Sequence, residues 1–368
     1  MSTKKDKFSL KDQLYMEIAL DLAKSREGLT GTNPSVGCVI VKNDKIISIG
    51  QTSTNGRPHA EFNAIKNCTE NPKDSKIYVT LEPCNHHGVT PPCTNLIISS
   101  KISEVFYSIE DIDKRVCGKT YKILKSKNIN VKKGLLKNRI KKFYVPYFFN
   151  KKNKLPYITG KIAISKNNLI YSKKNKKITN KFSNKFTHFL RYKNDSLMIT
   201  YKTLNIDNPK LNCRLKGMKK FSPKRIILDN KLNMNNNSYI FKTANKNNTI
   251  IFYNEAVKSK IFKFKKKKIQ LIKSKINKYK EFDINLIMKK LYNLGCRNIL
   301  IEGGNDLTRN LINMRSFNQF YLFKSHKKIS KLINYKEFNA FNILKRNYKN
   351  RIKLNSNFGK DTITLYKN

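Results

Sequence analysis

The chain has 368 residues, and 39% of them are hydrophobic, which is enough for packed cores in two domains. Lysine and arginine outnumber aspartate and glutamate by 77 to 24, giving a formal net charge of +53. The lysines are spread through the second half among asparagines, a pattern typical of AT-biased coding, and the lack of a focused basic stripe argues against a specific nucleic-acid partner.

The sequence also indicates the compartment. The N-terminus "MSTKKDKFSLKDQLYMEIAL" has no uninterrupted apolar core of the kind found in signal peptides. No apolar run approaches the ~18 residues that a membrane span needs. Seven cysteines, an odd number at irregular spacing, argue against a disulfide framework. We therefore expect a cytoplasmic protein without a membrane partner.

The first part of the chain alternates helix and strand signals. Residues 11–23 carry Leu14, Ile18 and Leu22 at helical spacing, with Met16 and Ala19 nearby. "VGCVIVKNDKIISIG" predicts a hairpin, "RPHAEFNAIKN" a helix, "KIYVTLEPC" a buried strand running into a second helix start, and "EVFYSIED" another strand. This alternation predicts an α/β sandwich over residues 1–150.

A second α/β domain is predicted over residues 151–368. The polar, lysine-rich stretch in "FFNKKNKLPYITGKIAIS" is interpreted as the bridge between the two domains. Strands are predicted at "RIILDN", "TIIFYN" and "NILIEGG", and a helix at "INLIMKKLYNLG". No internal repeat is found.

A metal site is predicted from four residues of the first domain. His59 and Glu61 lie two apart at a predicted helix start, Cys84 follows a proline at the predicted start of a second helix, and Cys93 follows "TPP". Helix N-termini favour thiolates because their free N–H groups stabilise negative charge. One imidazole and two thiolates form a tetrahedral zinc site with one position open, which is typical of a catalytic site.

The open position would hold a water whose pKa zinc lowers toward ~7. Glu61, beside the metal, can take the water's proton and pass it to a leaving amine, as in zinc deaminases. A lone cysteine is more often structural than a ligand, so the other cysteines are interpreted as core residues: Cys38, Cys68, Cys117, Cys213 and Cys296.

These motifs closely resemble a known family. The segment "NPSVGCVIV…GRPHAE…VTLEPCNHHGVTPPC" resembles the pyrimidine deaminases of riboflavin biosynthesis, in which the insert between the two cysteines is characteristically long. In that family the deaminase precedes an NADPH-dependent reductase of dihydrofolate-reductase-like fold. "PYITGKIAIS", "FLRYKNDSLMITYKTLNIDNPKLNCR" and "ILIEGG" are similar to segments of this reductase.

The resemblance implies a cytidine-deaminase-like α/β/α sandwich followed by a dihydrofolate-reductase-like α/β domain. It implies hydrolytic deamination of a diaminopyrimidinone ribosyl phosphate at its 2-position, followed by NADPH reduction of the ribosyl chain to ribityl. The implied cofactors are Zn²⁺ and NADPH, the implied partner is a small phosphorylated pyrimidine, and a homodimer is the family expectation.

The resemblance also assigns residues. In the deaminase, Asn33 contacts the pyrimidine ring and His86 lies near the substrate phosphate, while Val89 stands where the family usually has Arg or Lys. In the reductase, the implied substrate-binding residues are Arg191, Leu211, Arg214 and Glu302, and the implied cofactor-binding residues are Ala163, Thr203, Asp207 and Gly304.

Two alternatives stay open. The reductase half departs from the family, for example in "SKNN" at 165–168 and in Asn208 of "IDNP", so an active deaminase with a degenerate reductase is one alternative. An RNA-editing deaminase or nucleic-acid-binding protein is another, and the long insert between Cys84 and Cys93 argues against it.

Overall fold

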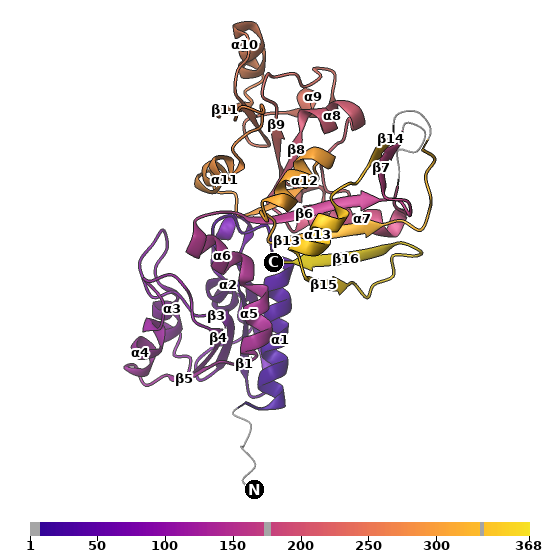
Figure 1. Cartoon of the computed structure of the whole chain (residues 1–368). Helices are drawn as coiled ribbons and strands as arrows, with labels where there is room; N and C mark the ends of the chain where they lie inside the picture. The colour runs from indigo at the N-terminus through magenta and orange to yellow at the C-terminus, as the bar shows by residue number, and fades with distance from the viewer. Residues whose placement is uncertain (1–7, 173–177, 332–334) are drawn as a thin grey trace. The chain divides into compact units, whose positions relative to one another are not determined.

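The computed structural model describes residues 8–172, 178–331 and 335–368. The chain forms two compact units, one ending at Lys154 and one beginning at Leu155 (Figure 1). The lysine-rich stretch predicted as a bridge is instead helical, because α6, Val145–Asn153, continues through it. Within the described ranges, no helix combines the length and apolar character needed to cross a membrane.

The first unit is built on one five-stranded sheet. Its strands are β1 (Gly37–Lys42), β2 (Lys45–Gln51), β3 (Lys76–Leu81), β4 (Glu104–Ile109) and β5 (Asn130–Lys133). Their order is β2-β1-β3-β4-β5, with β1 antiparallel to both neighbours and β3, β4 and β5 parallel. The predicted hairpin is confirmed: Asn43 and Asp44 both have positive φ, as a tight two-residue turn requires.

Helices cover both faces of this sheet. They are α1 (Leu10–Ser25), the 3₁₀ turn η1 (Thr54–Gly56), α2 (Ala60–Lys66), α3 (Cys93–Ser99), α4 (Lys119–Lys125), α5 (Lys137–Phe143) and α6. A Cβ on Gly37 would lie 1.8 Å from the Ala19 carbonyl oxygen of α1, and one on Gly50 would lie 2.2 Å from the Ala60 carbonyl oxygen of α2. Gly50 pairs with Cys38, the residue after Gly37, so the two glycines face opposite sides. The α/β/α sandwich is thereby confirmed.

The buried face of α1 differs from the predicted spacing. Tyr15, Met16, Ala19 and Leu20 are buried in the core, whereas Leu14 is 56% exposed. The helix carries apolar residues on two overlapping stripes, and periodicity alone does not tell which of them meets the sheet. The close approach at Gly37 selects the stripe that contains Ala19.

The second unit contains a nine-stranded sheet. Its order is β11-β10-β9-β8-β12-β6-β13-β16-β15, parallel from β11 to β13 and antiparallel beyond, and β7 pairs separately with β14. The strands are β6 (Tyr157–Ile164), β7 (Leu169–Ser172), β8 (Ser196–Thr200), β9 (Lys224–Leu228), β10 (Thr249–Tyr253), β11 (Gln270–Lys273), β12 (Asn298–Ile301), β13 (Gln319–Lys324), β14 (Tyr335–Glu337), β15 (Asn350–Lys353) and β16 (Thr362–Lys367).

Two apolar cores lie on the two faces of this sheet. Met198 belongs to one core, and its neighbours Leu197 and Ile199 belong to the other. The continuous apolar runs of the sequence are therefore strands buried on both sides. The helices are α7 (Lys181–Tyr192), α8 (Tyr201–Asp207), η2 (Lys219–Phe221), α9 (Tyr239–Thr243), α10 (Lys258–Lys266), α11 (Ile284–Asn293), α12 (Asn305–Asn313) and α13 (Phe341–Asn347).

Candidate functional site

Three side chains of the first unit form a group that can hold a metal ion. His59 Nδ1 lies 3.6 Å from Cys84 Sγ and 3.4 Å from Cys93 Sγ, and the ligand atoms of all three residues lie within 4.8 Å of one another. Zinc bonds of about 2.0–2.3 Å at tetrahedral angles place neighbouring ligand atoms about 3.6 Å apart. The donor set and its spacing therefore fit a tetrahedral zinc ion with three protein ligands.

The local backbone brings these residues together. His59 is the N-cap of α2, and Cys93 is the first residue of α3. The sequence predicted a helix start at Cys84, and this prediction was wrong. Cys84 lies in the loop after β3, and α3 starts only at Cys93. The free N–H of Cys93 donates to Cys84 Sγ over 3.3 Å, so one helix terminus contributes both a ligand and a hydrogen bond to the second sulfur.

The two sulfurs have different environments. A hydrogen bond from the Cys93 side chain, aided by His59, lowers the pKa of the Cys84 thiol to about 4. The same interaction with Cys84, together with burial, raises the pKa of Cys93. Cys84 is thus the readier thiolate of the pair, and thiolates are the form of cysteine that binds metals.

Glu61 lies in the first turn of α2, two residues after His59, and is 4% exposed. Burial raises the pKa of Glu61 to about 7, against the opposing effect of nearby His59. A carboxyl group with a pKa near neutrality can both accept and donate a proton at physiological pH.

A pocket opens beside this group, and His59, Glu61 and Cys84 line it together with both residues assigned to the pyrimidine substrate, Asn33 and His86. The Asn33 amide nitrogen donates to the carbonyl of Gly56 over 2.9 Å, which fixes the orientation of the amide. Nδ1 of His86 is buried and has no hydrogen-bond partner among the described residues.

The other cysteines are only partly the core residues that were expected. Cys38, Cys213 and Cys296 are buried, which confirms the prediction for them. Cys117 is exposed and Cys68 is half-buried. The prediction was wrong for Cys117, which lies in the turn before α4 rather than in a strand or helix.

In the second unit, neighbouring parallel strands end at the same edge of the sheet. Glu302, Gly303 and Gly304 follow the carboxyl end of β12, and α8 starts directly after β8, the neighbouring strand. Crevices at the carboxyl ends of adjacent parallel strands are the usual ligand sites of open α/β sheets.

Glu302 and Arg191 form a buried ion pair at this edge. Arg191 Nε and Nη2 donate to the two carboxylate oxygens of Glu302 over 2.7 and 2.8 Å, and the side chains are only 10% and 14% exposed. Nη1 of Arg191 donates to the carbonyl of Asn212. Burial alone would raise the pKa of Glu302, but Arg191 outweighs it and lowers the pKa to about 2.

Arg214 is placed differently. It is exposed, and its Nη1 donates to the side chain of Asn212 over 3.0 Å. Its backbone N–H donates to Nδ1 of the buried His188. Of the two arginines assigned to the substrate, Arg214 has the guanidinium that solvent and ligands can reach.

The residues assigned to the cofactor are brought together only in part. A Cβ on Gly304 would lie 3.2 Å from Oγ1 of Thr203, so the starts of α12 and α8 approach closely. Ala163 lies on β6. Asp207 is exposed at the end of α8.

Leu211, assigned to the reductase substrate, is 2% exposed and packs in an apolar core. Its side chain therefore does not offer a surface to a ligand. Its φ of 51° is unusual for leucine, and the backbone at this position is held in a sparsely populated conformation.

Lys161 lies close enough to Glu302 to feel its charge, and the sequence analysis did not single it out. It lies on β6, two residues before Ala163, and the two side chains share one face of the sheet. Burial lowers the pKa of Lys161, while the nearby carboxylate of Glu302 opposes this effect. A lysine in the middle of an otherwise apolar strand was the signal that could have identified it.

Comparisons with known proteins agree with this geometry. Residues 9–109 match the family described as the cytidine and deoxycytidylate deaminase zinc-binding region, and residues 157–325 match the RibD C-terminal domain. The chain is 32% identical over 358 residues to riboflavin biosynthesis protein RibD of Aquifex aeolicus, covering 97% of this chain and 98% of that protein. It is 44% identical over 147 residues to the diaminohydroxyphosphoribosylamino-pyrimidine deaminase of Buchnera aphidicola from Schizaphis graminum, covering 40% of this chain and all of that one.

Solved structures are also similar. The diaminohydroxyphosphoribosylaminopyrimidine deaminase/5-amino-6-(5-phosphoribosylamino)uracil reductase of Thermotoga maritima is 26% identical, with a TM-score of 0.78 over 97% of this chain and 98% of that one. RibD of Acinetobacter baumannii has a TM-score of 0.80 at 23% identity over the same shares. The predicted fold, a deaminase-like sandwich followed by a reductase-like α/β domain, is confirmed.

Proposed function

This chain belongs to the RibD family of riboflavin biosynthesis proteins. We propose that one of its two units carries out the deamination and the other the reduction. The protein is an enzyme of riboflavin biosynthesis with deaminase and reductase activities, and its cofactors are zinc and NADPH. In this proposal residues 1–150, extended to the observed boundary at Lys154, carry the deaminase, and the remainder carries the reductase.

The proposed deaminase substrate is 2,5-diamino-6-(5-phosphoribosylamino)pyrimidin-4(3H)-one, in keeping with the name of the Thermotoga relative. His59, Cys84 and Cys93 would hold zinc, which supplies Lewis-acid activation of water. Glu61 takes a proton from the attacking water and delivers it to the departing amine, so that the C2–N bond breaks and ammonia leaves. Asn33 orients the pyrimidine ring. The buried carboxyl with a pKa of about 7 beside the three ligands supports these roles.

In the proposed reductase, NADPH and the deaminated product would bind at the carboxyl ends of β8 and β12. Thr203 and Gly304, at the close approach of two helix starts, contact the cofactor, and Ala163 and Asp207 border its site. Arg214 binds the substrate phosphate, because its guanidinium is exposed. Glu302 and Lys161 face the ribosyl chain, and Arg191 holds Glu302 ionised. Bound NADPH would supply the hydride for the reduction.

The observation that carries this proposal is the meeting of His59, Cys84 and Cys93 around one point beside Glu61. The test is to supply the purified protein with zinc, the diaminopyrimidinone substrate and NADPH, and to follow ammonia release and NADPH oxidation. We expect ammonia first and NADPH oxidation after it. Absence of ammonia release from zinc-loaded protein would contradict the assignment.

The second candidate is an active deaminase with an inactive reductase. Two of the sequence departures from the family, in "SKNN" and "IDNP", keep the local backbone and so do not favour it. Asn168 of "SKNN" has φ of 62° and Asn208 of "IDNP" has φ of 41°. Asparagine is the residue other than glycine that tolerates this conformation best. These replacements therefore preserve the turns at which they occur.

We further propose that the enzyme is a cytoplasmic homodimer that acts on a small phosphorylated pyrimidine and has no nucleic-acid partner. All seven cysteines are free, which supports a reducing compartment. Light scattering at micromolar concentration tests the dimer: a mass near that of one chain, 43.0 kDa, would contradict it.

A further inference from the structure

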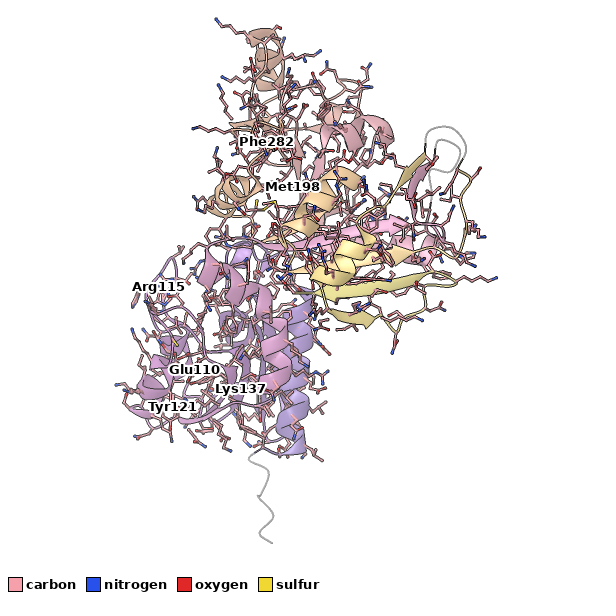
Figure 2. All side chains as sticks on the ribbon, in the orientation of Figure 1. Glu110, Arg115, Tyr121, Lys137, Met198 and Phe282 are labelled. Atoms are coloured by element: carbon pink, nitrogen blue, oxygen red, sulfur yellow. The ribbon has the colours of Figure 1, made fainter. Side chains whose placement is uncertain are left out.

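The wall of the deaminase pocket carries three strongly basic side chains, Arg57, Arg115 and Lys151. Two of them, Arg115 and Lys151, are paired with one carboxylate, that of Asp113. Arg115, labelled in Figure 2, donates from Nε and Nη2 to the two oxygens of Asp113 over 3.0 and 2.7 Å. Lys151 donates to the same carboxylate over 3.3 Å.

The other carboxylates near the pocket entrance are satisfied from within the fold. Glu82 accepts the backbone N–H groups of Asp111, Gly118 and Thr120 over 3.0–3.1 Å. Asp111 accepts the hydroxyl of Tyr147 over 3.0 Å. Within the described ranges, Arg57 is therefore the one cation of this pocket without a carboxylate partner.

Arg57 reaches the long insert between the two cysteines. Its Nη1 donates to Oγ1 of Thr90 over 2.6 Å, and a Cβ on Gly88 would lie 3.6 Å from its Nη2. The guanidinium thus bonds to Thr90 and lies near Gly88, the two residues that flank Val89. Val89 itself is 86% exposed and apolar, so its side chain offers nothing to an anion.

We propose that Arg57 binds the phosphate group of the deaminase substrate and supplies the positive charge that Val89 lacks. A guanidinium presents a rigid fork of N–H donors that matches phosphate, and the bond to Thr90 engages only part of that fork. The His86 side chain lines the same pocket. This inference rests on the proposed deaminase function and names the residue that selects phosphorylated pyrimidines.

The test compares the phosphorylated substrate with its dephosphorylated form in ammonia-release assays. Arg57→Ala should raise KM for the phosphorylated substrate roughly tenfold to a hundredfold, the loss expected for a charged hydrogen bond. Its kcat should change little, since phosphate binding stabilises ground and transition states alike. Turnover of the dephosphorylated form should stay at the wild-type level. Inorganic phosphate should inhibit the wild-type enzyme competitively and lose this effect in the variant.

Two further variants sharpen the test. Adding Val89→Lys to Arg57→Ala should restore much of the preference for the phosphorylated substrate, because position 89 adjoins the same space. Arg139→Ala removes an exposed arginine paired with Glu17 outside the pocket and should leave both substrates unaffected. Zinc per chain is measured in each variant, and it should equal that of the wild type.

The outcomes separate the two claims. Equal loss for both substrates, or no loss in Arg57→Ala, would overturn the phosphate assignment. A wild-type enzyme that deaminates both forms equally well would overturn it too. Absence of ammonia release from the zinc-loaded wild type would instead contradict the proposed function itself.

Discussion

Glu61 and His59 share the start of α2, yet their proposed roles differ because of where their side chains lie. His59 Nδ1 is within 3.6 Å of both cysteine sulfurs, whereas Glu61 is buried beside them and is absent from the group of metal-ligating atoms. A carboxyl placed in this way can move protons while leaving the metal bound.

Glu61→Gln should retain zinc and lose deamination by at least about a hundredfold, because the amide cannot carry the proton. Ammonia release and zinc per chain are measured together, with NADPH-dependent reduction of the deaminated intermediate as the control that should stay normal. Near-normal ammonia release would show that another group moves the proton.

The two arginines of the reductase should behave differently on truncation. Arg191→Ala leaves Glu302 buried without its partner and should destabilise the second unit by about 3–5 kcal/mol. Arg214→Ala removes an exposed side chain and should raise KM of the reductase with little change in stability. Denaturant unfolding and NADPH oxidation distinguish them. Similar unfolding curves for both variants would contradict the stabilising role of the Arg191–Glu302 pair. A loss of deamination as large as the loss of reduction would contradict the division of the two reactions between two units.

The Arg191–Glu302 pair also predicts a dependence of stability on pH. The pKa of Glu302 is lowered from 4.5 to about 2 in the folded state. The pair therefore contributes fully above about pH 4.5, and its contribution is lost as the pH falls from 4.5 toward 2. The loss amounts to roughly 2–3 kcal/mol. As the pH falls across this range, the free energy of unfolding should decrease less steeply in Glu302→Gln than in the wild type. Identical pH dependences of the two proteins would argue against the lowered pKa.

At the level of elements, the sequence predicted order and type well where the pattern was strong. The turn residues Asn43 and Asp44 specify the hairpin, and "PHAE" correctly begins a helix. The prediction of a helix start at Cys84 was wrong because a proline is common both at helix starts and in loops. Here the loop continues for nine residues before α3 begins at Cys93.

Residues that meet from distant parts of the chain were less predictable. Nothing in the sequence pattern indicates how α7 packs against the end of β12, so the pairing of Glu302 with Arg191, 111 residues away, was not predicted. Arg191 was assigned to the substrate by the family resemblance, together with Arg214. The exposed Arg214 fits that role better, and only packing distinguishes the two.

Gly50 sets the distance between α2 and the sheet. A Cβ there would lie 2.2 Å from the Ala60 carbonyl oxygen and 2.5 Å from the Ala64 amide nitrogen. Gly50→Ala should push α2 outward, displace His59, and weaken zinc binding at least about tenfold, because site geometry tolerates displacements of only about 0.5 Å.

Gly37→Ala is the matched control, since it meets α1 on the opposite face. It should destabilise the first unit while folded molecules keep their zinc affinity. Zinc titration of folded protein at low temperature separates the two effects. Equal zinc affinity in both variants would contradict a positioning role for Gly50.

For the whole molecule, the division into two compact units corresponds to two kinds of chemistry. The first unit gathers imidazole, thiolates and a protonatable carboxyl in one pocket. The second places Glu302 and two glycines between the end of a parallel strand and the start of a helix. The excess of positive charge is spread through both units and does not define either site.

The most direct test of the account is zinc content measured with both activities in one preparation. We predict one zinc per chain, ammonia release that stops when a chelator removes the metal and returns when zinc is added back, and NADPH oxidation with the deaminated intermediate that continues throughout. Cys84→Ser should lose zinc and ammonia release together. Full ammonia release from a chain that holds no zinc would contradict the claim that His59, Cys84 and Cys93 form a catalytic metal centre.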